Sequence, residues 1–132
     1  MTSDNLKVYI SGPISSRPAS ENDGAFNEAA LKLESMGFIP VSPWFGDEGL
    51  TWEGYMKRDI AMMMDCDMLL MLDGWDYSQG ATIERNLGLQ LRYPVLYENR
   101  LDQGDYDLHQ WFRTDTGIAC KNLTVDEYLE TL

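Results

Sequence analysis

The sequence predicts an α/β fold, a three-layer doubly wound sandwich in which helices cover both faces of a mainly parallel sheet. Two observations predict it. Strand-like and helix-like segments alternate from residue 6 to residue 97, as in βαβ units. Residues 67–73 read D-M-L-L-M-L-D, an apolar run without alternation that indicates a central strand buried on both faces. With 132 residues, we expect a single domain over residues 1–132.

The first part of the chain predicts two strands around one helix. Residues 6–10 are aromatic and β-branched, and Ser-Gly-Pro follows them, which indicates a strand that ends there. Residues 15–24 are polar and predict a loop, and residues 25–36 have helical periodicity. Gly37 is placed to end that helix, and residues 38–41 predict a short second strand.

The middle of the chain continues this alternation on both sides of the apolar run. Thr51 is a suitable N-cap for a helix that extends to about Asp65. After the run, we expect a loop over residues 74–79, a helix over residues 80–92 and a strand over residues 94–97.

Residues 98–132 are less regular. An acidic stretch precedes Trp111 and Phe112, whose rings we expect to pack on the sheet edge or on another subunit. A last helix is expected from Thr124, which is a plausible N-cap.

Composition narrows the function. A net charge of −12 repels polyanions, which argues against a nucleic acid polymer as partner. No apolar run reaches the roughly 20 residues of a membrane span and no leader pattern is present, so we expect a cytoplasmic protein. His109 is the single histidine, and Cys66 and Cys120 make no metal or redox spacing. We therefore expect no metal and no cofactor, and Cys66 is interpreted as a small buried apolar residue.

Parallel sheets bind ligands beyond the carboxyl ends of their strands, so the site should be built from residues 11–24, 42–50 and 73–80. Glu84 follows the last of these loops and is expected in or near the first turn of its helix. Helix amides there would keep the carboxylate ionised, and an ionised carboxylate in a pocket can attack an anomeric carbon. The alternative is that Glu84 only complements the helix dipole.

Asp59 is the second candidate carboxylate. It lies at helical spacing on a mostly apolar stripe with Trp52, Met56 and Met63. An acid in such a place is costly unless it is paired or faces a cavity, which makes Asp59 a candidate for a raised pKa and for a general acid. The alternative is an ion pair with a nearby cation, although neighbours in a helix such as Arg58 do not face each other.

Two loops have residues suited to an anion. The first strand is followed by small, hydroxyl and guanidinium groups that fit a phosphate or carboxylate: Gly12, Ser15, Ser16 and Arg17. Ser78 and Gly80 offer a hydroxyl and a glycine at a helix start. Ordinary turn chemistry explains both equally well. Nearby Trp75 could stack on a nucleobase or simply pack.

Together these residues resemble the nucleoside 2-deoxyribosyltransferase superfamily, which includes the 2′-deoxynucleoside 5′-phosphate N-hydrolases. The resemblance covers roughly residues 6–97. The segments that carry it are Y-I-S-G-P-I-S-S-R from Tyr9, R-D-I from Arg58, C-D-M-L-L-M-L from Cys66 and S-Q-G-A-T-I-E from Ser78.

The resemblance implies a flavodoxin-like fold and a nucleoside or nucleotide as the small-molecule substrate. It also implies Glu84 as nucleophile, a supporting role for Asp59, and a hydrogen bond from Tyr9 that orients Glu84. Members assemble as homodimers or larger homo-oligomers. Six residues before the nucleophile, base-exchanging transferases have aspartate and the hydrolases have a serine that binds the 5′-phosphate; here it is Ser78. This favours hydrolysis of a nucleotide, although Asp76 could take the transferase role.

The sequence therefore predicts an enzyme that cleaves an N-glycosidic bond through a glycosyl-Glu84 intermediate, with Asp59 or Asp76 as acid. The alternatives are base exchange by a transferase, a non-catalytic module that binds or senses a small nucleotide, and a structural subunit whose acidic surface meets a basic partner.

Overall fold

The structure is a computed structural model that describes residues 6–14, 19–44, 49–103, 108–114 and 117–123. Strands and α-helices alternate as predicted in its first part. The strands there are β1 (Lys7–Ser11), β2 (Ile39–Val41), β3 (Met68–Met71) and β4 (Val95–Tyr97). The α-helices are α1 (Ala19–Ser35), α2 (Trp52–Met64) and α3 (Gln79–Gln90).

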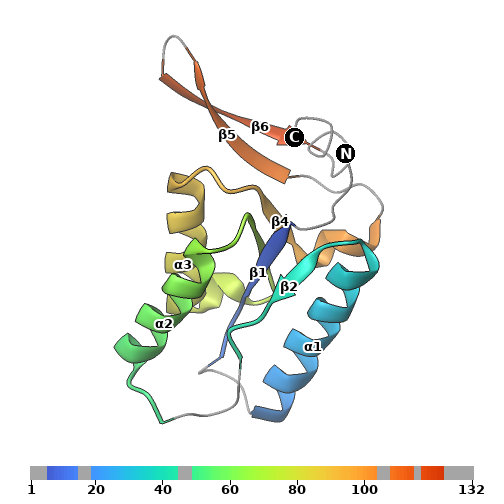
Figure 1. The fold of residues 1–132 in the computed structure, drawn as a ribbon, viewed down its shortest axis with the longest axis vertical. Helices are drawn as coiled ribbons and strands as arrows, with labels where there is room; N and C mark the ends of the chain where they lie inside the picture. The colour runs from blue at the N-terminus through green and yellow to red at the C-terminus, as the bar shows by residue number, and fades with distance from the viewer. Residues whose placement is uncertain (1–5, 15–18, 45–48, 104–107, 115–116, 124–132) are drawn as a thin grey trace.

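The strands form one sheet in the order β2-β1-β3-β4-β5-β6, and the first four are parallel. From β1 the chain moves outward to β2, and from β3 it moves outward in the other direction to β4. The order therefore reverses between β1 and β3, and sheets of this kind bind ligands at the carboxyl ends of such a strand pair. Helix α1 lies on one side of the sheet, and α2 and α3 lie on the other (Figure 1). The predicted three-layer, flavodoxin-like α/β fold is confirmed.

Alternate side chains of the central strands build two separate cores. Val8 and Ile10 of β1 pack with residues of α1, including Phe26. Tyr9, between them, packs on the other face with residues that include Met63 of α2. Each fully buried large apolar side chain contributes about 1.5–3 kcal/mol. The apolar run around β3 is explained in the same way, because its residues alternate between the two cores.

Two local predictions need correction. Helix α1 begins at Ala19, inside the stretch predicted as a polar loop. Its first turns are polar because they are mostly exposed, and the amide of Asn22, which is buried, donates to the Ile14 carbonyl oxygen at 2.9 Å. The predicted loop before α3 contains a short 3₁₀ helix, η1 (Trp75–Tyr77).

The predicted N-cap of α2 is confirmed, since Thr51 accepts a hydrogen bond from the Gly54 amide at 3.0 Å.

The chain after β4 is more regular than expected. A 3₁₀ helix, η2 (Glu98–Gln103), leads to an antiparallel hairpin of β5 (Leu108–Thr114) and β6 (Gly117–Leu123). The hairpin continues the sheet from β4 and extends away from the helical layers (Figure 1). The predicted helix from Thr124 and the side chains of Trp111 and Phe112 lie outside the described residues. Within the described part of the chain, no helix has the length and apolar character needed to cross a membrane.

Candidate active site

Glu84 is a buried carboxylate held by two hydroxyl groups from β1. Glu84 is 5% exposed and lies on the face of α3 that packs against the sheet. The Tyr9 hydroxyl donates to Glu84 Oε2 at 2.7 Å, and the Ser11 hydroxyl donates to Oε1 at 2.7 Å. The hydrogen bond expected between Tyr9 and Glu84 is therefore present, and each carboxylate oxygen has one donor.

The alternation of β1 explains why these two hydroxyl groups meet one carboxylate. Residues two apart in a strand point to the same face, so Tyr9 and Ser11 both face the layer of α2 and α3. They lie roughly 6.5–7 Å apart along the strand, a distance that the long Tyr9 side chain covers. Ser11 pairs in register with Met71 at the end of β3. The carboxylate consequently lies at the strand pair where the order of the sheet reverses.

The expectation that the helix start keeps Glu84 ionised is wrong. Helix α3 has no acidic residue in its first turn, because it begins at Gln79 and Glu84 comes later. Burial instead raises the pKa of Glu84 to about 7, and the negative charge of Asp59 adds to this rise, while the hydrogen bonds from Tyr9 and Ser11 oppose it. At neutral pH the carboxyl group is thus divided between its charged and neutral forms.

Tyr9 remains a hydrogen-bond donor throughout the physiological pH range. Burial, and next the negative charge of Glu84, raise the pKa of its hydroxyl far above the ordinary value. A tyrosinate beside a carboxylate in this interior would be an unpaired second negative charge. The Tyr9 proton therefore stays in place to hold Glu84.

Asp59 is buried near Glu84 and forms an ion pair. Its residue is 5% exposed, and its Oδ1 lies 3.0 Å from both Nε and Nη2 of Arg58. Arg58 Nη2 also donates to the Pro43 carbonyl oxygen at 2.8 Å. The argument that sequence neighbours in a helix do not meet is wrong here, because the long Arg58 side chain reaches both the Asp59 carboxylate and the Pro43 carbonyl oxygen. Of the two interpretations of Asp59, the structure shows the ion pair with a nearby cation.

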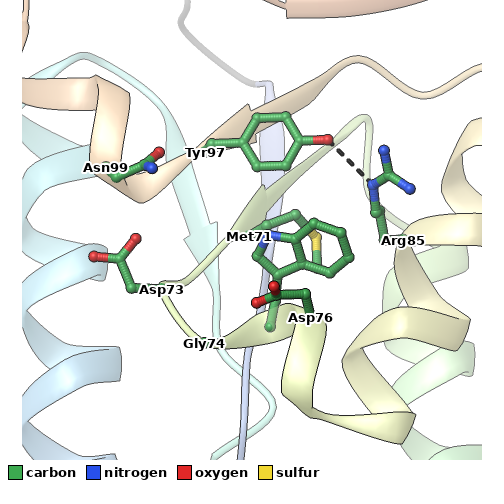
Figure 2. Close-up of a pocket in the computed structure, with 8 residues that line it drawn as sticks. Met71, Asp73, Gly74, Asp76, Arg85, Tyr97 and Asn99 are labelled. Atoms are coloured by element: carbon green, nitrogen blue, oxygen red, sulfur yellow. Dashed lines mark hydrogen bonds between the residues drawn. The ribbon is translucent and has the colours of Figure 1, made fainter.

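A pocket of about 480 Å³ lies at the ends of β3 and β4 (Figure 2). Its lining residues are Met71, Asp73, Gly74, Trp75, Asp76, Arg85, Tyr97 and Asn99. Arg85 Nε donates to the Tyr97 hydroxyl at 3.1 Å, and the guanidinium group lies 4.8 Å from the centre of the Trp75 ring. Asp76 lines this pocket, whereas Glu84 does not.

The candidate phosphate residues separate into two groups. Ser15, Ser16 and Arg17 lie outside the described residues. Ser78 caps α3, because its hydroxyl oxygen accepts a hydrogen bond from the Ala81 amide at 3.2 Å.

Both candidate glycines have packing reasons. A Cβ atom on Gly12 would lie 2.8 Å from Leu72 Cβ, and one on Gly80 would lie 3.0 Å from Met56 Sδ. Close approach of neighbouring elements therefore accounts for the lack of a side chain at each position. In the described part of the chain, no group of three or more His, Cys, Asp and Glu residues is placed to hold a metal ion.

Two residues of the site were missed in the sequence. Ser11 was considered only as the end of a strand, although the spacing Y-I-S places its hydroxyl on the same face as that of Tyr9. Arg85 was not considered, because nothing in its sequence context indicates that Trp75 and Tyr97 lie beside it.

Comparisons with known proteins agree with this architecture. The solved structure of a 2-deoxyribosyltransferase from Bacillus psychrosaccharolyticus is similar, with a TM-score of 0.53, 21% sequence identity, and coverage of 70% of this chain and 71% of that chain. No curated protein matches significantly. A family model described as a domain of unknown function, DUF4406, matches residues 6–97. Since this match spans all four parallel strands and the helices between them, the chain belongs to the DUF4406 family.

Proposed function

We propose that this protein is an enzyme that cleaves the N-glycosidic bond of a (deoxy)nucleoside 5′-monophosphate or nucleoside, by hydrolysis through a glycosyl-Glu84 intermediate. One observation carries the proposal: a buried carboxylate with a hydroxyl donor on each oxygen lies at the carboxyl edge of the parallel sheet. Such a group is sheltered from water, oriented, and partly ionised at neutral pH. The similarity in fold to a 2-deoxyribosyltransferase supports the same reaction class.

In the first step, a Glu84 carboxylate oxygen attacks C1′ of the sugar as the bond from C1′ to the base nitrogen breaks. The bonding electron pair leaves with the base, which takes up a proton. Positive charge develops on the sugar ring in the transition state, as in retaining glycosidases. The negative charges of Glu84 and of nearby Asp59 stabilise it.

Asp59 and Asp76 are the candidate acids for the departing base. Asp59 is engaged in the ion pair with Arg58, which places it in a role of electrostatic support. Asp76 is exposed on η1 and lines the pocket at the ends of β3 and β4. Asp76 is therefore the candidate that can relay a proton to the departing base from a water molecule in the pocket.

In the second step, water attacks C1′, the bond to Glu84 breaks, and the carboxylate is regenerated. Ser78 supports a nucleotide as substrate, because its hydroxyl oxygen accepts the capping bond and its hydrogen remains available for a phosphate oxygen. In the alternative, base exchange, a free base takes the place of water in this step. This alternative is supported by the similarity in fold to a 2-deoxyribosyltransferase.

The experiment is a panel of nucleosides and deoxynucleoside monophosphates, with and without a free acceptor base, followed by chromatography of the products. Released base without an acceptor indicates hydrolysis, and a new nucleoside formed only with an acceptor indicates transfer. A 2-fluoro sugar substrate should leave a covalent adduct on Glu84 that mass spectrometry detects. Turnover without any adduct would contradict the covalent route.

Two variants separate catalysis from simple binding. Glu84→Gln should abolish turnover and retain ligand binding by calorimetry, whereas Glu34→Gln on the exposed side of α1 should change neither. If wild type binds a nucleotide but releases no base, the protein is a binding module instead. If it binds no small molecule at all, a structural role remains.

A further inference from the structure

We propose that Ser11 is a positioning residue for the reaction, because its hydroxyl holds one oxygen of Glu84 while Tyr9 holds the other. This inference rests on the proposed function, since it concerns the nucleophile of that reaction. It adds a residue that the family resemblance does not assign.

The contact has the geometry of a strong hydrogen bond. Ser11 is fully buried and Glu84 is 5% exposed, so water does not compete for either group. The distance of 2.7 Å between Ser11 Oγ and Glu84 Oε1 is within the short range of a bond from a hydroxyl to a carboxylate. Inside a protein such a bond is stronger than in water.

Two hydrogen-bond donors on different oxygens restrict the orientation of the Glu84 carboxylate more than one donor does. With Tyr9 alone, the carboxylate can rotate about its last single bond while Oε2 keeps its partner. With Ser11 on Oε1 as well, rotation breaks one of the two bonds, so the plane of the carboxylate is fixed. When the attacking oxygen is already oriented, less of the activation free energy is needed to bring it into line with C1′.

The same bond favours the charged form that attacks. Burial raises the pKa of Glu84 to about 7, and the Ser11 bond is one of two interactions that oppose this rise. Loss of a charge-assisted hydrogen bond corresponds to about one pH unit. Without Ser11 we expect a pKa of about 8, which leaves about fivefold less ionised Glu84 at pH 7.

Ser11→Ala removes the hydroxyl, and Ser11→Cys replaces it with a weak donor of similar size. Ser35→Ala is the matched control, because it removes an exposed hydroxyl that donates to the Lys32 carbonyl oxygen at the end of α1. Two quantities are measured for each protein. The first is the pKa of Glu84 without ligand, from ¹³C NMR of glutamate-labelled protein with Glu84→Gln for assignment. The second is the rate of adduct formation with a 2-fluoro deoxynucleoside monophosphate between pH 5 and 9.

We expect both Ser11 variants to have a pKa near 8 and an adduct rate at least about fivefold below wild type at pH 7. The part of the deficit that comes from the pKa should be recovered at pH 9, and the part that comes from lost orientation should remain there. The control should match wild type. A Ser11→Ala protein with wild-type pKa and pH profile would overturn the proposal, as would a cysteine variant that behaves like wild type. If wild type forms no adduct and releases no base, the proposed function fails instead, and the NMR arm still decides whether Ser11 controls the charge of Glu84.

Discussion

The charge of Glu84 results from two opposing influences at one residue. Removal from water favours the neutral acid, and the hydroxyl groups of Tyr9 and Ser11 favour the carboxylate. The balance places the pKa at about 7, so small changes in this cluster alter the ionised fraction of Glu84 at neutral pH.

The first prediction concerns the pH dependence of the reaction. In the proposed mechanism only the ionised carboxylate attacks. The rate of glycosyl-enzyme formation should therefore rise about tenfold per pH unit at low pH, reach half its maximum near pH 7, and level off above pH 8. Rapid-quench measurement of the adduct with a 2-fluoro substrate isolates this step. A flat profile from pH 5 to 9 would show that Glu84 titration does not limit it.

The second prediction concerns stability. The folded pKa of Glu84 is raised from 4.5 to about 7, so the native state binds the proton more tightly than the unfolded chain. The stability from this group is fully present below about pH 4.5 and is lost as pH rises through about 7, a change of about 3 kcal/mol. Glu84→Gln lacks this loss. Its free energy of unfolding in urea, relative to wild type, should therefore increase between pH 5 and pH 8.

The same comparison has a direct control. Glu34→Gln should parallel wild type at every pH, because Glu34 is exposed on α1. Equal pH dependence of Glu84→Gln and wild type would mean that the carboxyl group is not buried in solution as it is here.

At this scale, the sequence predicts which residues lie close together better than it predicts the environment of each one. Glu84, Asp59 and Tyr9 were selected from motif order and helical spacing, and the structure does bring them together. Their charges were predicted less well. Whether a carboxylate is solvated by helix amides or buried against a strand depends on which face of α3 meets β1, and spacing alone does not determine that packing. The partner of Asp59 was missed for a similar reason, since it depends on how Arg58 reaches Pro43.

Among the elements, α3 makes a close contact with the sheet. Gly88 faces Leu69 of β3, and a Cβ atom there would overlap Leu69 Cδ1. Leu69 is fully buried between its neighbours, so it has little room to move. The glycine therefore allows α3 to approach the sheet at the distance that puts Glu84 beside Ser11.

The third prediction compares two helical glycines. Gly88→Ala should destabilise the protein by about 1–3 kcal/mol through overpacking, although alanine is the better helix former. Gly24→Ala in α1 should stabilise by up to about 1 kcal/mol, because no atom lies within 4 Å of its added Cβ. Chemical denaturation of both variants measures the difference. If Gly88→Ala is neutral or stabilising, the close contact between α3 and β3 is absent.

Elements with a clear pattern of apolar residues were predictable from the sequence, and elements without one were not. The helices after β2 and β3 follow from apolar spacing and their caps, and the buried strands follow from apolar runs. The start of α1 was missed because an exposed polar turn of helix looks like a loop. The hairpin of β5 and β6 was missed because its strands pair mainly with each other, and its sequence shows no alternation clear enough to identify them.

On the scale of the whole molecule, the sheet has two parts: the parallel strands β1–β4 and the antiparallel hairpin of β5 and β6. Strand β3 lies between β1 and β4 with both cores around it. The hairpin joins this part through Val95 of β4 paired with His109 of β5.

The fourth prediction follows from this difference. In native-state hydrogen exchange followed by NMR, amides of β3 should exchange only through global unfolding, and those of β5 and β6 should exchange through a smaller opening of lower free energy. Equal protection of both regions would indicate that the hairpin and the parallel strands unfold as one unit.

Assembly as a homodimer or larger oligomer stays a prediction, and it rests on the family resemblance. Light scattering coupled to size-exclusion chromatography should give at least twice the mass of 15.1 kDa for one chain. A monomer at micromolar concentration would contradict it.

The place of Glu84 and its two hydroxyl donors in the fold has a consequence for engineering. All three side chains come from a strand and a helix of the rigid interior, and none comes from a connecting segment. Segments at the carboxyl edge can then be exchanged with those of other proteins to change what is bound, while the orientation of the reactive group is retained. Selectivity and reactivity would in that case be separately adjustable in this scaffold.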